Sequence, residues 1–353
     1  MNRGGCIAAT LTSAIFAAFA CATPAAAADA PILDAHTHIT ASPGGGSFAP
    51  ALKAELTAMN TFGIRKAIVM SPPRGAFIAA NFDYPDFIKD VAPQRDRFAF
   101  LGGGGTLNPM MHGIDPAKVT EADRAKFRQS ALDILAAGAS GFGEMSALHV
   151  SLNAEHQYNY APADHPLLLD LADIAAEHDV PIDLHMDLLT APEPTPRQLA
   201  GYQNPKTLPA TLPALEHLLA HNLKAKIVWD HGGSDWIGHL TPQLIGGLMD
   251  RYPNLYMSLR PVPAPAPVSN KLFSQAGLNS QWASLLKRHP DRFFIGTDCF
   301  YVPPGATGAP AEFSRQNTVK LQATRAFLRL LPVELARKIA YENAAALFKL
   351  TLN

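Results

Sequence analysis

Two histidines lie two residues apart in the segment 31–39, PILDAHTHI, at the end of a short apolar run. On a β-strand, residues i and i+2 point to the same face, so the imidazoles of His36 and His38 can reach one point. Neutral imidazole is a common ligand of first-row divalent metals. The chain has 13 histidines, however, so this pair predicts a metal site only if other ligand-type residues converge on it.

Short apolar runs rich in β-forming residues alternate with helical segments along the chain. Eight such runs are predicted strands: Ile32–His38, Lys66–Ser71, Phe98–Gly102, Gly141–Met145, Val180–His185, Lys226–His231, Leu255–Leu259 and Phe293–Asp298. They extend over about 270 residues, or roughly 33 per strand-plus-helix unit, which is typical of a (β/α)8 barrel. The predicted fold class is therefore α/β, a single-domain TIM barrel.

Between these runs, apolar residues recur at the spacing of an amphipathic helix. It is clearest in residues 49–63, 125–138, 165–179, 212–222, 317–331 and 332–350. The segments that follow the strands are long and rich in Gly and Pro, whereas those that precede them are mostly short. Function in such barrels collects on the loops at the C-terminal ends of the strands. We therefore expect long loops and the functional site at that face.

Three more ligand-type residues lie at the C-terminal ends of other predicted strands. His185 ends the fifth strand in PIDLHMD, His231 ends the sixth in IVWDHGG, and Asp298 ends the eighth in FFIGTDCF. In a closed barrel these strand ends surround a single mouth, where the H-x-H pair also lies. Several neutral imidazoles and a carboxylate suit a divalent first-row metal with positions left for water.

These motifs resemble the amidohydrolase superfamily, in particular the amidohydrolase-related barrels called family 2. The resemblance rests on DAHTH, GFGEM, PIDLHMD, IVWDHGGS, FIGTD and the late ENAAALF, and it covers nearly the whole chain after the leader. It implies that His36, His38 and His185 are metal ligands. It also implies that His231 binds metal or polarises the substrate, and that Asp298 binds metal and handles the proton.

Three charged residues near the predicted mouth have two readings each. Glu144 lies where two-metal relatives carry a bridging carboxylate or a modified lysine; it is either a ligand or base, or an acid that only bonds a neighbouring loop. Arg260 either binds a substrate carboxylate or lies on the surface. Asp34 either orients a ligand histidine or fills the barrel. We expect one divalent ion, zinc before manganese or iron, with two ions as the alternative.

A divalent ion at such a site lowers the pKa of water toward neutrality. Asp298 would then accept the proton, and His231 would stabilise charge on the attacked carbonyl oxygen. The expected function is hydrolysis of an ester, lactone or amide bond of a small molecule. One alternative is a metal-dependent decarboxylase or hydratase of a small aromatic or unsaturated carboxylic acid, which a carboxylate-binding Arg260 would favour. Another is a non-catalytic envelope ligand-binding barrel, against which the intact ligand set argues.

Composition limits the class of partner. The chain has 29 basic and 30 acidic residues with no cluster of Lys and Arg, which argues against nucleic acid or an anionic membrane as the main partner. Hydrophobic residues make up 48% of the chain, enough for a large core. We therefore expect a small-molecule substrate. A homo-oligomer remains open.

The N-terminus has the pattern of a secretory signal peptide. A single basic residue, an apolar run and a run of small residues occupy positions 1–28, and cleavage is expected after Ala28. An uncleaved membrane anchor is the alternative, although the apolar run is short for a membrane span. A lipid anchor at Cys21 is a further alternative, but the sequence before Cys21 lacks the aliphatic residue that usually leads a lipoprotein motif. The catalytic domain would then be residues 29–353, periplasmic or secreted, with Cys299 as its only cysteine and no internal disulfide.

Overall fold

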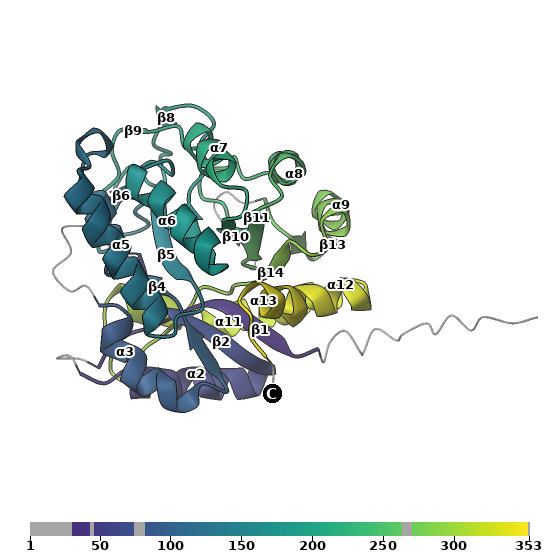
Figure 1. The fold of residues 1–353 in the computed structure, drawn as a ribbon. Helices are drawn as coiled ribbons and strands as arrows, with labels where there is room; N and C mark the ends of the chain where they lie inside the picture. The colour runs from purple at the N-terminus through teal and green to yellow at the C-terminus, as the bar shows by residue number, and fades with distance from the viewer. Residues whose placement is uncertain (1–29, 43–45, 74–81, 263–269, 352–353) are drawn as a thin grey trace, which may run out of the picture.

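The computed structural model describes residues 30–42, 46–73, 82–262 and 270–351. The predicted signal peptide lies outside the described residues. Parallel strands occupy the middle of the molecule and helices surround them (Figure 1). The strands are β1 (Ile32–Ile39), β2 (Ile64–Met70), β3 (Phe98–Phe100), β4 (Gly102–Gly103), β5 (Phe142–His149), β7 (Pro181–Met186), β10 (Lys226–Gly232), β11 (Leu255–Leu259), β14 (Phe293–Ile295) and β15 (Cys299–Tyr301).

Strand pairing forms two sheets, and two continuous chain segments that contribute to both sheets join them into the barrel. One sheet has the order β15-β1-β2-β3, and the other has β14-β11-β10-β7-β5-β4. β3 and β4 belong to one continuous segment, in which β3 pairs with β2 of the first sheet and β4 pairs with β5 of the second. In the same way, β14 pairs with β11 of the second sheet and β15 pairs with β1 of the first. The amide of Leu101 donates to the Val69 carbonyl (3.1 Å) and that of Gly296 to the Leu259 carbonyl (3.0 Å), across the two interruptions. The prediction of a (β/α)8 barrel and its eight strands is confirmed.

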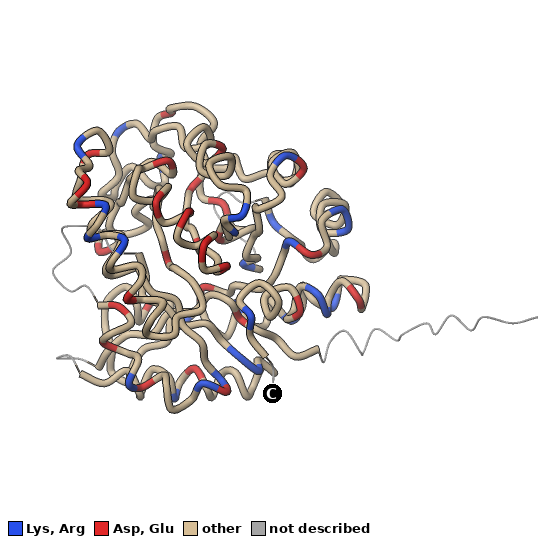
Figure 2. The backbone as a smooth tube through the Cα atoms, in the orientation of Figure 1, with Lys and Arg blue, Asp and Glu red and all other residues tan. Residues whose placement is uncertain are grey.

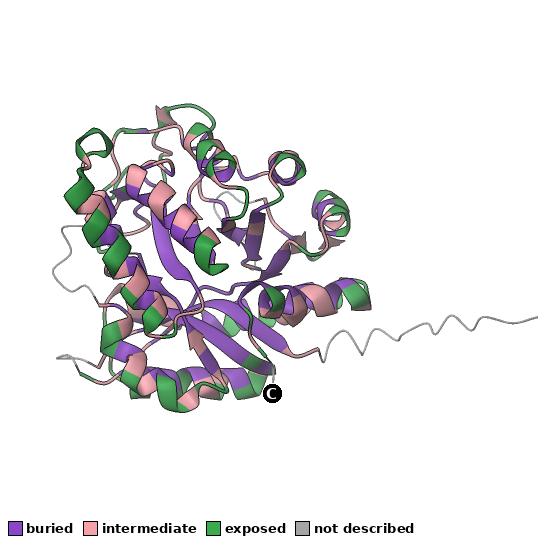
Figure 3. Ribbon diagram, viewed as in Figure 1, coloured by how far each residue is buried: buried purple, intermediate pink, exposed green. Residues whose placement is uncertain are grey.

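One main helix follows each barrel strand. These helices are α2 (Ala49–Phe62), α3 (Tyr84–Val91), α5 (Glu121–Ala136), α6 (Pro166–His178), α7 (Leu212–His221), α8 (Pro242–Arg251), α9 (Ser280–Arg288) and α11 (Asn317–Arg329). The sequence indicated five of them, and α3, α8 and α9 were not singled out. Their inner faces are buried against the strands and their outer faces are exposed (Figure 3). Local signals fix their ends: Thr120 and Asp123 form a capping box at α5, and Gly63 ends α2 with φ 68°.

The C-terminal segment fills the bottom of the barrel. It comprises α12 (Val333–Arg337), a π-helical turn (Lys338–Glu342) and α13 (Asn343–Leu347). Leu347 and Phe348 pack with Leu33, Val228 and Phe294, which line the barrel near the starts of their strands. The opposite end, where the strands finish, is thus left for the functional site.

The connections at that opposite end are long, as expected. They contain the short elements α4 (Leu107–His112), β6 (Asn159–Tyr160), β8 (Glu193–Pro194), β9 (Thr207–Leu208), β12 (Phe273–Ser274), β13 (Gly277–Leu278) and α10 (Ala309–Ser314). Short 3-10 turns at residues 92–94 and 116–118 precede β3 and α5. Acidic and basic residues are interspersed along the outer helices (Figure 2). Within the described ranges, no helix has the length and apolar character that a membrane span requires.

Candidate active site

The two histidines of β1 are fully buried, and their Nε2 atoms face each other at 3.1 Å. The Nδ1 atom of His38 lies 3.2 Å from the carbonyl oxygen of Met70, which can only accept a hydrogen bond. The Nδ1 atom of His36 lies 3.2 Å from Asp183 and 3.6 Å from Asp230. These contacts assign a proton to both Nδ1 atoms and leave both Nε2 atoms pointing at one common position.

The Glu144 carboxylate lies at the centre of the cluster and is 2% exposed. Its Oε2 atom is 3.5 Å from Nε2 of His36 and 3.3 Å from Nε2 of His38. Its Oε1 atom is 2.8 Å from Nδ1 of His185 and 3.8 Å from Nε2 of His231. Burial raises the pKa of Glu144, but the surrounding imidazoles outweigh it and hold the pKa well below its usual range. An ionised carboxylate therefore joins two pairs of histidines. Glu144 lies inside β5 and not at its end, since this strand continues to His149, whereas the predicted strand ended at Met145.

His185 and His231 turn different nitrogens toward the centre. His185, on β7, presents Nδ1, while its Nε2 lies 3.7 Å from Asp187. His231, near the end of β10, presents Nε2, which is 3.1 Å from Nδ1 of His185. Burial lowers the pKa of His185, but Asp187 and Glu144 outweigh it and raise the pKa to about 10. Burial lowers the pKa of His231, which is therefore the neutral member of the pair.

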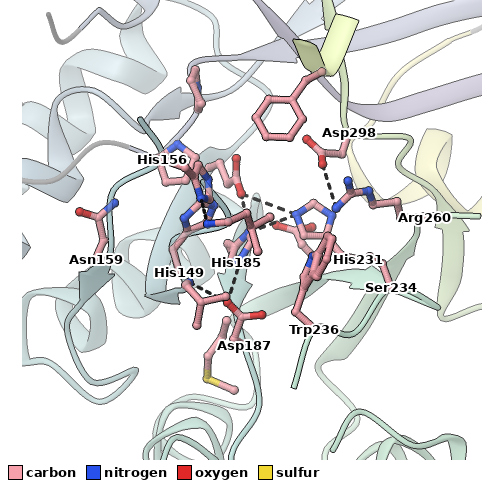
Figure 4. Close-up of a pocket in the computed structure, with 18 of the residues that line it drawn as sticks. His149, His156, Asn159, His185, Asp187, His231, Ser234, Trp236, Arg260 and Asp298 are labelled. Carbon is pink, nitrogen blue, oxygen red and sulfur yellow. Dashed lines mark hydrogen bonds and ion pairs between the residues drawn. The ribbon is translucent and has the colours of Figure 1, made fainter. Parts of the chain in front are cut away.

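Asp298 lies between β14 and β15 and is the last ligand-type residue of the cluster; Figure 4 shows it beside Arg260 and near His231. It has a left-handed φ of 51°, and His231 has one of 69°; such strained positions persist where the surrounding structure fixes them. Asp298 Oδ1 lies 3.3 Å from Nε2 of His38, and Oδ2 lies 3.1 Å from Nη1 of Arg260. The ammonium group of Lys320 donates to the Asp298 backbone oxygen. Burial raises the pKa of Asp298, but Arg260 and then Lys320 hold it well below its usual range.

Arg260 lies at the site and not on the surface. Its side chain is 11% exposed, lines the cavity above the cluster and is paired with Asp298. Its Nε atom is buried without a hydrogen-bond partner in the part of the chain that the structure describes. The guanidinium thus contacts the Asp298 carboxylate and also lines the cavity, so both a structural and a substrate-binding role fit its position.

The residues of the cluster fit a divalent metal ion. His36, His231 and Asp298 each offer a ligand atom within 4.8 Å of the others, and so do His36, His38 and Glu144. Burial lowers the pKa of His36, but Asp183 and Asp230 outweigh it and raise the pKa well above its usual value. A field that favours a proton so strongly on a buried imidazole also favours a metal cation there. Imidazole and carboxylate ligands are those that zinc and its neighbours prefer.

A cavity of about 340 Å³ lies over the cluster at the C-terminal ends of the strands. Its floor contains His38, Glu144 and Asp298. Its walls come from the strand ends and the segments that follow them, and they combine polar side chains with the apolar residues Pro72, Leu240, Trp236, Phe300, Pro310 and Phe313. The volume suits a small molecule whose polar, reacting part faces the floor and whose apolar part faces the loops.

Sequence reasoning missed four residues of this site. Asp183 and Asp230 contact His36, Lys320 of α11 holds Asp298, and His149 lines the cavity beside His185. Asp183 had a signal, because it lies two residues before His185 on the same strand. Asp34, for which the sequence left two roles open, accepts hydrogen bonds from the Thr297 amide (2.9 Å) and hydroxyl (2.6 Å) and from the backbone amide of His36 (3.4 Å), and bonds no histidine ring in the described part of the chain.

Comparison with known families now identifies the class. The amidohydrolase family model, Amidohydro_2, matches residues 33–350, so the chain belongs to this family. Its members are metal-dependent enzymes on a TIM barrel that act on small molecules, and the protein is accordingly a metal-dependent hydrolase. The resemblance inferred from the motifs is confirmed.

Solved structures with similar chains include amidohydrolases. Amidohydrolase 2 from Bifidobacterium longum subsp. infantis is 9% identical with a TM-score of 0.43, over 91% of this chain and 100% of that one. An amidohydrolase from Pseudomonas aeruginosa is 11% identical with a TM-score of 0.47, over 93% and 98%. N-acetyl-D-glucosamine-6-phosphate deacetylase from Mycobacterium smegmatis is 12% identical with a TM-score of 0.36, over 93% and 71%. The comparison with curated proteins found no match.

Proposed function

We propose that the protein activates water to cleave an ester, lactone or amide bond of a small molecule, with zinc as its metal. The observation that carries this proposal is the pair of Nε2 atoms of His36 and His38, 3.1 Å apart, with the Asp298 carboxylate 3.3 Å from the second. A metal site with an ionised carboxylate at its edge is the arrangement that water activation requires. The nitrogen-rich ligand set favours zinc over manganese or iron.

The residues of the cluster would each have a different role in the reaction. The His36 and His38 Nε2 atoms and Asp298 would hold the ion, which supplies Lewis acidity and lowers the pKa of water. Asp298 is ionised, because Arg260 and Lys320 outweigh its burial, so it can accept the proton of the attacking water and return it to the leaving group. Neutral His231 faces the same position and would stabilise charge on the carbonyl oxygen.

The cavity supports a substrate with an apolar body. Its loop walls contain Trp236, Phe300 and Phe313, against which a flat or aliphatic group can pack. Arg260 is the feature that favours the alternative, decarboxylation or hydration of a small carboxylic acid, because its side chain lines the cavity and its buried Nε atom has no described partner. We propose further that the enzyme works outside the cytoplasm after loss of residues 1–28, on the pattern of its leader.

The test is a substrate screen with the zinc-loaded protein. Neutral esters, lactones and amides are compared with aromatic and unsaturated carboxylic acids, each before and after removal of metal by a chelator. We expect cleavage of at least one neutral substrate, loss of that activity with the chelator and its return with Zn²⁺. Carbon dioxide release from an acid, with no cleavage of neutral substrates, would replace hydrolysis by the alternative.

A further inference from the structure

His156 lies in the loop that follows β5 and lines the cavity, but the proposed water activation does not use it. The loop folds back after His149, so that β6 pairs antiparallel with the end of β5 and Asn159 lies opposite His149. Within the loop, the backbone amide of His156 donates to the Asn153 carbonyl (3.2 Å). This turn brings the His156 ring against the His149 ring, with 4.3 Å between their centroids (Figure 4).

A backbone hydrogen bond fixes which nitrogen of His156 carries the proton. The Leu152 amide donates to Nδ1 of His156 (2.9 Å), so Nδ1 carries no proton. Burial, and after it the charge of His185, lowers the pKa of His156 to about 4, so the ring is neutral near neutral pH. A neutral imidazole has a single N–H group, and in His156 that group is Nε2–H.

The Nε2–H group of His156 is a donor that the described part of the chain leaves free. No hydrogen bond or ion pair joins Nε2 to a described residue, and Nε2 is not among the polar atoms that are enclosed without a partner. Because the side chain lines the cavity, Nε2 is open to a bound ligand. A donor held in one orientation at a cavity wall selects ligands that carry an acceptor at that place.

We propose that the Nε2–H group of His156 determines specificity by binding a neutral hydrogen-bond acceptor of the substrate, a carbonyl, ether or ring nitrogen atom outside the bond that is cleaved. The acceptor lies outside that bond because the His149 ring separates His156 from His185 of the metal-type cluster. The acceptor is neutral because Glu155 and Asp187 line the same cavity and would repel a carboxylate. This inference rests on the proposed function, since it assigns a binding role within that reaction.

The first experiment observes the donor directly and needs no catalysis. Zinc-loaded protein with ¹⁵N-labelled histidine is studied by NMR, and the His156 signals are assigned by their absence in His156→Asn. At neutral pH we expect a proton on Nε2 and none on Nδ1. Acetophenone and anisole, which carry one acceptor, should shift the Nε2–H signal, whereas ethylbenzene should not. A proton on Nδ1, or an Nε2–H signal that neither acceptor moves, would overturn the inference.

The second experiment uses two variants that separate substrate binding from a structural role. His156→Gln keeps a donor near the position of Nε2, whereas His156→Asn keeps an acceptor for the Leu152 amide and loses the donor. The probes are 4-acetylphenyl acetate and 4-ethylphenyl acetate, each compared with the wild type. We expect His156→Asn to raise KM for the acetyl ester alone by about tenfold, with kcat within about threefold of the wild type, and His156→Gln to stay closer to the wild type.

The matched control is His217→Asn on α7, which should leave KM unchanged for both esters because its side chain is exposed and pairs with Asp164. Impairment of His156→Gln with a normal His156→Asn would show that the ring only holds the loop; it would overturn the inference, while cleavage of the esters would still support the proposed function. Cleavage of neither ester, with the Nε2–H shift present, would leave the donor role standing and count against ester hydrolysis.

Discussion

The Nη1 atom of Arg260 lies 3.1 Å from Oδ2 of Asp298, while Oδ1 of the same carboxylate lies 3.3 Å from Nε2 of His38. Asp298 is thus held between a guanidinium and the metal-type cluster. Burial raises the pKa of Asp298, but Arg260 is the largest of the influences that lower it. The ion pair therefore keeps the carboxylate ionised, and a bound substrate would share Arg260 with an enzyme residue.

This relationship predicts the effect of Arg260→Ala on the pH profile. Without the guanidinium the pKa of Asp298 rises, so a smaller fraction is ionised in mild acid and the acid limb of kcat moves to higher pH. The shift should occur with neutral and acidic substrates alike. Arg288→Ala is the control, since this exposed arginine pairs with Asp250 far from the cavity lining. A rise in KM for acidic substrates alone, with no shift of the limb, would instead show that Arg260 binds a substrate carboxylate.

Asp298→Asn should separate catalysis from metal binding. The amide keeps the shape of the side chain but loses its basicity, so we expect normal folding, retention of most of the metal and a kcat lower by about a hundredfold or more. Turnover and zinc content are measured on the same sample. Near-normal kcat would move the proton transfer to another group, with Glu144 the next candidate.

The fold could be predicted almost completely, because in this chain each buried strand is bounded by Gly- and Pro-rich or helical segments that mark its ends. Site residues at strand ends followed from the same reasoning: His36, His38, His185, His231 and Asp298 meet as predicted.

Residues near irregular strand pairing are those that the sequence could not assign. The register of β1 with β2 shifts between Asp34 and Thr37, and the Asp34 carboxylate bonds Thr297 and not a histidine ring. β5 also has register shifts, and His149 could not be placed from the sequence. Lys320 lies on a helix 22 positions after Asp298, and no local pattern relates the two residues.

Asp83 is predicted to be important for stability. It begins α3 and is 2% exposed, and its carboxylate accepts from the amides of Tyr84 (2.8 Å) and Gly103 (2.8 Å) and from the Thr106 hydroxyl (2.7 Å). Asp83→Ala leaves these donors without partners, and we expect it to lower the free energy of unfolding by about 3 kcal/mol. The exposed cap Asp115 is the control: Asp115→Ala should cost less than about 1 kcal/mol in the same urea titration. Equal losses would contradict this assignment.

Cysteine titration tests both the burial of Cys299 and the processing of the leader. Cys299 is fully buried, and burial raises the pKa of its thiol to about 12, so the thiol should not react with a disulfide reagent in the native protein. The chain has 3 cysteines, two of them in residues 1–28. After denaturation, protein from the periplasm or medium should therefore show a single thiol and an N-terminus near Asp29. Three thiols in that fraction would show that the leader is retained.

The most direct test of the account is to locate the metal between His36 and His38. Crystals of the zinc-loaded protein are measured at wavelengths on both sides of the zinc absorption edge, together with crystals of His38→Ala. We predict an anomalous peak in contact with Nε2 of both histidines in the wild type, and its loss in the variant while the barrel is unchanged. Zinc-loaded wild-type crystals without a peak at these two nitrogens would contradict the account.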